Sequence, residues 1–205
     1  MATVRPLKPS PEVPPPTLSD RAIDNLRYIR ETMERAGSFT AISGWGMTAV
    51  GAIALLASVV SLARPTPGWW LGTWLTTAAC CTVLSLATMI AKARRTGTSL
   101  VSGPARKLGL AFAPSVVAGL VLTAALVRGE QYALLPGVWL LVYGAGVVAA
   151  GAFSTRVIPV LGAACIGAGA VALFVPQPYG TWSMALAFGV LHVACGVQIA
   201  RRHGG

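Results

Sequence analysis

Six long apolar runs without charge are the feature that most limits what this chain can fold into. No Asp, Glu, Lys or Arg lies in any of them. A helix rises about 1.5 Å per residue, so about 20 residues cross a hydrocarbon core about 30 Å thick. The runs therefore predict an all-α, polytopic bundle of six transmembrane helices. They cover approximately residues 41–63, 69–91, 108–127, 131–153, 157–175 and 181–200.

The composition excludes a soluble globular domain. Only 11% of the residues are charged and 55% are hydrophobic, whereas a soluble domain carries about 25% charged residues. The net charge of +10 could indicate a protein that binds nucleic acid. The basic residues, however, lie at the ends of the apolar runs, where they orient a membrane protein. We therefore predict a lipid bilayer as the environment of the chain and no nucleic-acid partner.

The distribution of basic residues also predicts the orientation. If the N-terminus lies inside, all of the 16 Lys and Arg residues except Arg64 and Arg128 lie on the cytoplasmic side. Such an excess of positive charge in cytoplasmic loops is typical of membrane proteins. An even number of spans then places both termini in the cytoplasm.

The first 37 residues precede the bundle, which begins at about residue 38. Residues 1–17 contain six prolines, which predicts a disordered tail. Residues 18–37 predict a cytoplasmic amphipathic helix ending at Gly37, because apolar residues recur at spacings of three and four. Its basic and acidic residues cancel, which argues against an anchor at an anionic membrane surface. We expect the apolar stripe of Leu26, Ile29 and Met33 to contact the bundle's own loops, a second copy or another protein.

A second basic segment is predicted as a loop over residues 92–107. It contains Lys92, Arg94, Arg95, Arg106 and Lys107. Near an anionic surface each basic residue contributes about 1 kcal/mol of attraction, so these five are candidates for binding lipid headgroups. The alternative is that they only set the topology, and topology alone accounts for them.

His192 is the histidine that falls within a span. Cys195 follows on the same helix face, and Cys165 on the fifth span is a third candidate metal ligand. Two or three soft ligands without a carboxylate make an incomplete metal site. A role of His192 as a single axial haem ligand has no further support in the sequence. The alternative is that His192 bonds across the bundle, as we also expect of Tyr143. We therefore expect His192 to be structural and the protein to hold no cofactor.

Small residues mark the helix faces that are expected to pack closely. In the first span these are Gly44, Thr48 and Ala52. In the fifth span they are Ala164, Ala168 and Ala172, with Gly162, Gly167 and Gly169 nearby.

Four sequence blocks resemble an uncharacterised bacterial family of small six-span integral membrane proteins with no established activity. The similarity runs from about residue 19 to the C-terminus. It implies a bacterial inner-membrane protein and assigns no catalytic residue. The blocks are residues 30–46 (RETMERAGSFTAISGWG), 141–146 (LVYGAG), 151–154 (GAFS) and 188–192 (FGVLH).

Three functions are consistent with these observations. The first is a non-enzymatic accessory, scaffold or sensor protein that acts through the helix at 18–36. The second is a channel or carrier for a neutral or lipophilic solute, with His192, Tyr143 and Gln198 as its polar groups. The third is a protein that binds a cofactor or metal through His192. We favour the first, because intramembrane charge usually marks transport and the sequence has no nucleophile with an adjacent base.

The predicted orientation is tested by labelling with a membrane-impermeant maleimide. A cysteine introduced at Thr66 or Gln177 should react from outside the cell, because both positions fall in predicted external loops. A cysteine at Thr98 should react only after the membrane is opened, and the unsubstituted chain controls for the native thiols. External labelling at Thr98 would overturn the orientation.

Overall fold

The computed structural model describes most of the chain after residue 17. The predicted tail over residues 1–17, Gly37 and the labelling positions Thr98 and Gln177 lie outside the described residues. Two compact units, residues 1–36 and 37–205, are separate in the structure. The described residues are 18–36, 39, 41–64, 66–97, 99–101, 103–176 and 179–203.

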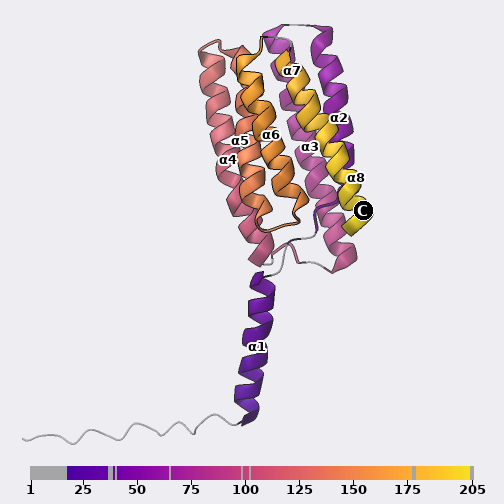
Figure 1. Cartoon of the computed structure of the whole chain (residues 1–205), viewed down its shortest axis with the longest axis vertical. Coiled ribbons are helices and arrows are strands. Elements are labelled where there is room, and N and C mark those ends of the chain that lie inside the picture. The colour runs from indigo at the N-terminus through magenta and orange to yellow at the C-terminus, as the bar shows by residue number, and fades with distance from the viewer. Residues whose placement is uncertain are drawn as a thin grey trace, which may run out of the picture. The chain divides into compact units, whose positions relative to one another are not determined.

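The described part of the first unit is a single helix, α1, which spans Leu18–Ala36 (Figure 1). The side chains of Leu26, Ile29 and Met33 are 67%, 52% and 69% exposed. The structure thus has a helix over residues 18–36, and its cytoplasmic, amphipathic role stays a prediction. What its apolar stripe contacts stays a prediction.

The second unit is an all-α bundle of six long helical spans (Figure 1), and the described residues contain no strand. Each span is long and apolar enough to cross a membrane. The chain is therefore a multi-pass integral membrane protein, as the apolar runs predict. The first three spans are α2 (Gly44–Ala63), α3 (Pro67–Thr96) and α4 (Gly103–Arg128). The next two are α5 (Leu135–Gly151), preceded by the short 3₁₀ turn η1 (Tyr132–Leu134), and α6 (Val157–Phe174). The last combines α7 (Tyr179–Met184), the π-helical segment η2 (Ala185–Leu191) and α8 (His192–His203).

The connection between α3 and α4 is much shorter than the predicted loop at 92–107. Helix α3 continues to Thr96 and ends at Gly97, which has a φ of 67°. A left-handed residue at this position is a common helix C-cap, and glycine adopts it without steric cost. The prediction stopped the helix at the first charge. A helix nevertheless continues past the hydrocarbon core when its last turns reach the polar interface.

Helices α5 and α6 pack backbone to backbone at glycines. A Cβ added at Gly144 would lie 2.6 Å from the Gly162 carbonyl oxygen, and one at Gly162 would lie 2.7 Å from the Gly144 carbonyl oxygen. Seven residues along each helix, Gly137 and Gly169 face each other in the same way. A Cβ added at Gly137 would lie 3.0 Å from the Gly169 carbonyl oxygen, and one at Gly169 would lie 2.9 Å from the Gly137 carbonyl oxygen. A seven-residue spacing returns to nearly the same helix face. Two points of contact therefore fix the register of this antiparallel pair.

Helix α2 meets the last span in the same way. A Cβ at Gly44 would lie 2.6 Å from the Gly196 carbonyl oxygen, and one at Gly51 would lie 2.7 Å from the Gly189 carbonyl oxygen. The predicted close face of α2 is thus right at Gly44 but wrong at Ala52, which is exposed. Gly51 takes its place, because a spacing of seven follows the contact line more closely than a spacing of eight.

The predicted close face of α6 needs a similar correction. Ala164 is exposed and Gly167 has no neighbour within 4 Å of a Cβ, whereas Ala172 is buried. Gly162 and Gly169, expected only to lie near this face, form the contact with α5.

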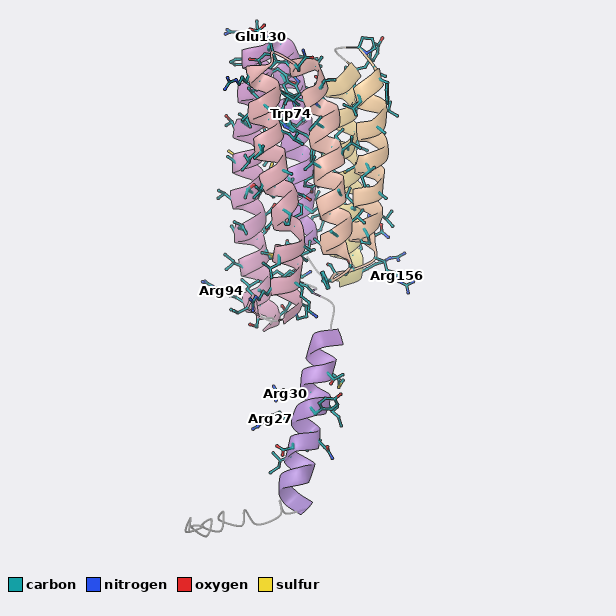
Figure 2. All side chains as sticks on the ribbon, turned by 90° about the vertical axis from the view of Figure 1, so that its left-hand side faces the viewer. Arg27, Arg30, Trp74, Arg94, Glu130 and Arg156 are labelled. Atoms are coloured by element: carbon teal, nitrogen blue, oxygen red, sulfur yellow. The ribbon has the colours of Figure 1, made fainter. Side chains whose placement is uncertain are left out.

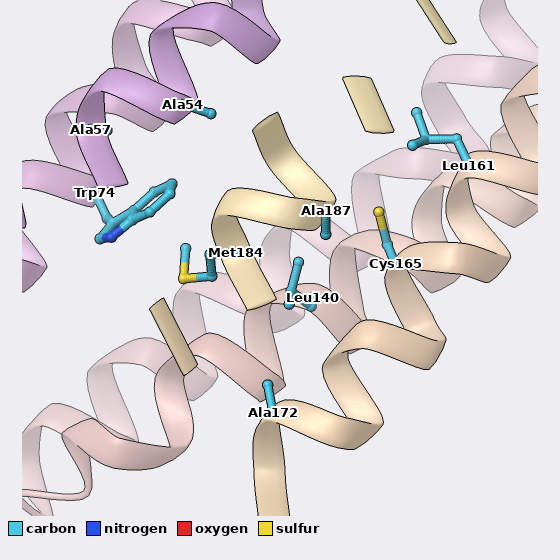
Figure 3. Close-up of a cluster of buried hydrophobic side chains, with 9 residues drawn as sticks. All are labelled: Ala54, Ala57, Trp74, Leu140, Leu161, Cys165, Ala172, Met184 and Ala187. Carbon is cyan, nitrogen blue, oxygen red and sulfur yellow. The ribbon is translucent and has the colours of Figure 1, made fainter. Parts of the chain in front are cut away.

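Helices α3 and α4 cover the bundle from one side. Helix α3 packs against α2, and α4 packs against α5. Trp74 of α3 reaches inward to the main apolar core, where Figure 3 shows it beside Met184. The same core includes Leu140 of α5 and Cys165 of α6. Most residues of α3 and α4 remain exposed, as is expected for helices that face lipid.

The glycine contacts can be tested by adding one methyl group. Gly144→Ala should lower the thermal stability of the purified protein, because the new Cβ meets the backbone of α6. Overpacking of this kind costs about 1–3 kcal/mol. Gly167→Ala is the matched control and should leave the midpoint temperature unchanged or raise it, because that position is open. Equal midpoints for the two variants would contradict the close contact.

Candidate functional site

A pocket of about 510 Å³ lies within the second unit. Residues of α2, α3, α4, α5 and the last span line it, and most of the lining is apolar. Small-molecule sites are typically clefts of about 300–1,000 Å³ with apolar walls and a few polar groups. The pocket has this character. Its aromatic lining residues are Trp74, Phe112, Trp139, Tyr143 and Phe188.

The polar centre of the pocket is a hydrogen bond between Tyr143 and His192. The Tyr143 hydroxyl oxygen on α5 lies 2.8 Å from His192 Nε2 on α8, and both residues line the pocket. The other ring nitrogen, Nδ1, lies 2.8 Å from the Ala187 carbonyl oxygen. The sequence predicts that each residue bonds across the bundle. The structure confirms this for the pair, since the two residues bond to each other.

The direction of these bonds follows from the chemistry of the partners. A carbonyl oxygen can only accept, so His192 Nδ1 carries a hydrogen and donates it to Ala187. His192 is 3% exposed, and no span contains an Asp or Glu that would pair with a charged imidazole. The imidazole is therefore neutral and its Nε2 is an acceptor. The Tyr143 hydroxyl donates to Nε2, which leaves the oxygen of Tyr143 free only to accept.

The backbone before His192 is a π-helix. This segment, η2, spans Ala185–Leu191 and contributes Phe188 to the pocket and the Ala187 carbonyl to His192. Single π-helical turns are rare and frequently occur at functional sites. Nothing in the hydrophobic pattern of this run distinguishes it from an ordinary α-helix, so the sequence does not predict it.

A continuous series of aromatic rings extends from this polar centre. Tyr143 and Phe188 have ring centroids 4.9 Å apart, and Phe188 and Trp74 are 6.3 Å apart. Trp74 contacts Trp70, which stacks on Trp139 at 5.4 Å. Distances of 4.5–7 Å are favourable for aromatic pairs. These residues come from α3, α5 and η2, so sequence separation concealed the cluster.

Trp74 differs from the other indoles of this series in its hydrogen bonding. Trp70 donates to Thr181 Oγ1 at 2.9 Å, and Trp139 donates to Thr123 Oγ1 at 2.8 Å. Trp74 is 3% exposed, and its Nε1 has no partner. Within the described residues, only Thr155 Oγ1 shares this state. An unpaired buried N–H costs about 1–3 kcal/mol, so the pocket wall is not optimised for stability alone.

The outer wall of the pocket faces lipid. Ala78, Thr82 and Leu86 on α3 and Val116 on α4 line the pocket and are also exposed. We call the part of the pocket lined by these exposed residues of α3 and α4 its lateral mouth. In Figure 2, Trp74 lies toward the end of the bundle that carries Glu130, away from Arg94 and Arg156.

The predicted metal ligands have other roles in the structure. Both nitrogens of His192 are used by Tyr143 and Ala187. Cys165 is buried in the apolar core and Cys195 packs against it. Among the described residues, no group of three or more His, Cys, Asp or Glu is placed to hold a metal ion.

The structure separates Lys92 from the other candidate headgroup ligands. Lys92 is only 5% exposed, and its Nζ donates to the Ile42 carbonyl oxygen at 3.1 Å. Its expected exposure to lipid headgroups is therefore wrong. No pattern in the sequence indicates this contact, because the acceptor is a backbone carbonyl 50 residues away. Arg94, Arg95, Arg106 and Lys107 are exposed, as headgroup ligands must be.

The Ile42 carbonyl belongs to a short segment that enters the bundle ahead of α2. Phe39 and Ala41 in this segment are buried. The Phe39 N–H donates to the Phe153 carbonyl at 2.7 Å, and the Ser154 hydroxyl donates to the Phe39 carbonyl at 2.9 Å. The segment is thus fixed both to α3 and to the connection between α5 and α6.

Comparison of the chain with protein-family models, with curated proteins and with solved structures finds no match. The resemblance to a bacterial family stays a prediction. The site must therefore be interpreted from its own geometry.

Proposed function

We propose that this six-span membrane protein binds a lipophilic small molecule in the pocket between α3 and α4. The observation that carries the proposal is the pocket itself: about 510 Å³ of mostly apolar, aromatic-lined space around one polar pair. Its lateral mouth between exposed residues of α3 and α4 gives a solute direct access from the lipid. A charged solute is disfavoured, because no span contains a charged group at the depth of the pocket.

This proposal draws on two of the functions considered for the sequence. Binding is the step that a carrier of a lipophilic solute and a sensor of one have in common. The pocket supports that step and does not distinguish the two. We also propose the orientation that the basic residues favour, with the end of the bundle that carries Arg94 and Arg156 in the cytoplasm of a bacterial cell.

The binding proposal is tested by narrowing the mouth. Ala78 lines the pocket and is exposed, whereas its neighbour Ala79 is exposed and does not line it. The wild-type protein, extracted gently and purified, should carry a lipophilic molecule in about one-to-one ratio, measured by mass spectrometry of its organic extract. Ala78→Phe should lose this molecule, and Ala79→Phe should retain it. Equal content in all three proteins would contradict binding in the pocket.

The predicted role of α1 in an accessory or scaffold protein is a separate proposal. The observation that favours it is the exposure of Leu26, Ile29 and Met33. An isolated helix of this length is marginal in water, and burying one such side chain contributes about 1.5–3 kcal/mol. Contact with a protein surface would therefore stabilise the helix.

Paired substitutions test this role of α1. A photoreactive residue at position 29 should crosslink to protein, and Leu26→Asp combined with Met33→Asp should abolish the crosslink while membrane insertion persists. Arg27→Gln combined with Arg35→Gln changes the net charge by the same amount on the side of the helix away from the stripe and should leave the crosslink intact. Crosslinks to lipid alone would show that α1 is an interfacial anchor.

A further inference from the structure

We propose that the pocket selects a lipophilic aromatic alcohol, a molecule with a phenol or hydroquinone headgroup and an apolar tail. The inference rests on the proposed function and adds the chemistry of the ligand. It is carried by the pairing of Tyr143 with His192, by the aromatic walls around that pair and by the lateral mouth.

The hydrogen-bond direction at Tyr143 requires a ligand that donates. The hydroxyl hydrogen of Tyr143 is committed to His192 Nε2 at 2.8 Å, and Nδ1 is committed to Ala187. The Tyr143–His192 pair therefore offers a ligand only the lone pairs of the Tyr143 oxygen, which accept a hydrogen bond. A ligand that only accepts, such as a ketone or an ether, would gain no bond from this pair without taking the hydrogen from His192. A buried imidazole nitrogen would then be left unpaired, which is unfavourable.

The walls around this oxygen favour a flat ring. Phe112 meets Tyr143 edge to face, with centroids 5.9 Å apart and planes at 89°. Phe188 also contacts Tyr143, with centroids 4.9 Å apart and planes at 64°. Rings in these orientations offer both faces and edges to a third ring, and aromatic pairs prefer such offset or edge-on contacts. A hydroxyl on an aromatic ring would thus reach Tyr143 while its ring packs against Phe112 or Phe188.

The lateral mouth of the pocket explains why the proposed ligand can carry an apolar tail. The volume of about 510 Å³ accommodates a substituted ring and a few further carbons, so a longer chain must leave the pocket. The exposed lining residues of α3 and α4, Thr82, Leu86 and Val116, mark where it would pass into the lipid. The ligand would therefore remain in the membrane throughout and need not cross water.

The test compares two ligands that differ by one hydrogen-bond donor. 4-Dodecylphenol has a free hydroxyl, and in 4-dodecylanisole a methyl ether replaces it. The full-length protein in lipid nanodiscs is incubated with tritiated 4-dodecylphenol, each unlabelled compound is used as a competitor, and binding to empty nanodiscs is subtracted. The phenol should bind the wild-type protein about tenfold more tightly than the anisole, since a site that accepts a hydroxyl hydrogen discriminates against an analogue that lacks it.

Two variants locate the selectivity. Tyr143→Phe keeps the ring but removes the accepting oxygen, and it is combined with His192→Phe because His192 also lines the pocket and its freed Nε2 would otherwise accept in place of Tyr143. This variant should bind both compounds with the weaker affinity of the anisole. Tyr179→Phe is the control, because Tyr179 is exposed and does not line the pocket, and it should retain the tenfold preference.

The outcomes separate the two proposals. If neither compound binds saturably to the wild-type protein, the proposed binding function itself fails. If both bind the wild-type protein equally, the pocket binds lipophilic molecules but the inference about the hydroxyl is wrong, whether or not any variant folds. A phenol preference that persists when both Tyr143 and His192 are replaced by Phe would also overturn the inference, since this pair would not supply the acceptor.

Discussion

Close backbone contact at glycines is the interaction on which the rest of this structure depends. Within lipid there is little hydrophobic force to drive one apolar helix against another, so association depends on close packing and a few hydrogen bonds. Gly144 and Gly162 bring α5 and α6 together, and Gly44 and Gly196 do the same for α2 and the last span. In both pairs the absent side chain is what allows the carbonyl of one helix to approach the backbone of the other. The bundle is therefore built on two tightly joined pairs.

The pocket depends on the two helices that these glycine contacts do not join. Helices α3 and α4 each attach to one pair, to α2 and to α5 respectively. Trp74, Phe112 and Phe188 line the pocket, and the bond between Tyr143 and His192 is its polar centre. The unpaired Nε1 of Trp74 shows that this region is less completely satisfied than the glycine contacts. Tightly packed pairs beside an incompletely satisfied pocket wall agree with the proposed binding of a lipophilic small molecule.

The sequence predicts the spans well because the lipid imposes one simple rule, that about 20 residues must be apolar. The class of fold and most helix limits follow from it within a few residues. The exceptions are that α3 continues to Thr96 and that α4 begins at Gly103, so that both include charged residues placed in the predicted loop. Contacts between helices are less predictable. Tyr143 and His192 were each expected to form a bond, but no pattern in one sequence shows that residues 49 positions apart bond to each other. Lys92 illustrates the same limit, since its charge pointed to the membrane surface whereas its acceptor is the backbone at Ile42.

The seven-residue spacing of the interface glycines has a consequence for how the length of these helices can change. One inserted residue turns the rest of a helix by about 100°. An insertion between Gly137 and Gly144 would therefore move one of them off the face of α5 that meets α6, whichever one stays in place. Substitutions on the lipid-facing side leave this register untouched, whereas a single insertion or deletion destroys it. An inserted or deleted residue is therefore compatible with these contacts only outside the stretches between paired glycines, so α2, α5, α6 and the last span need a fixed number of residues there.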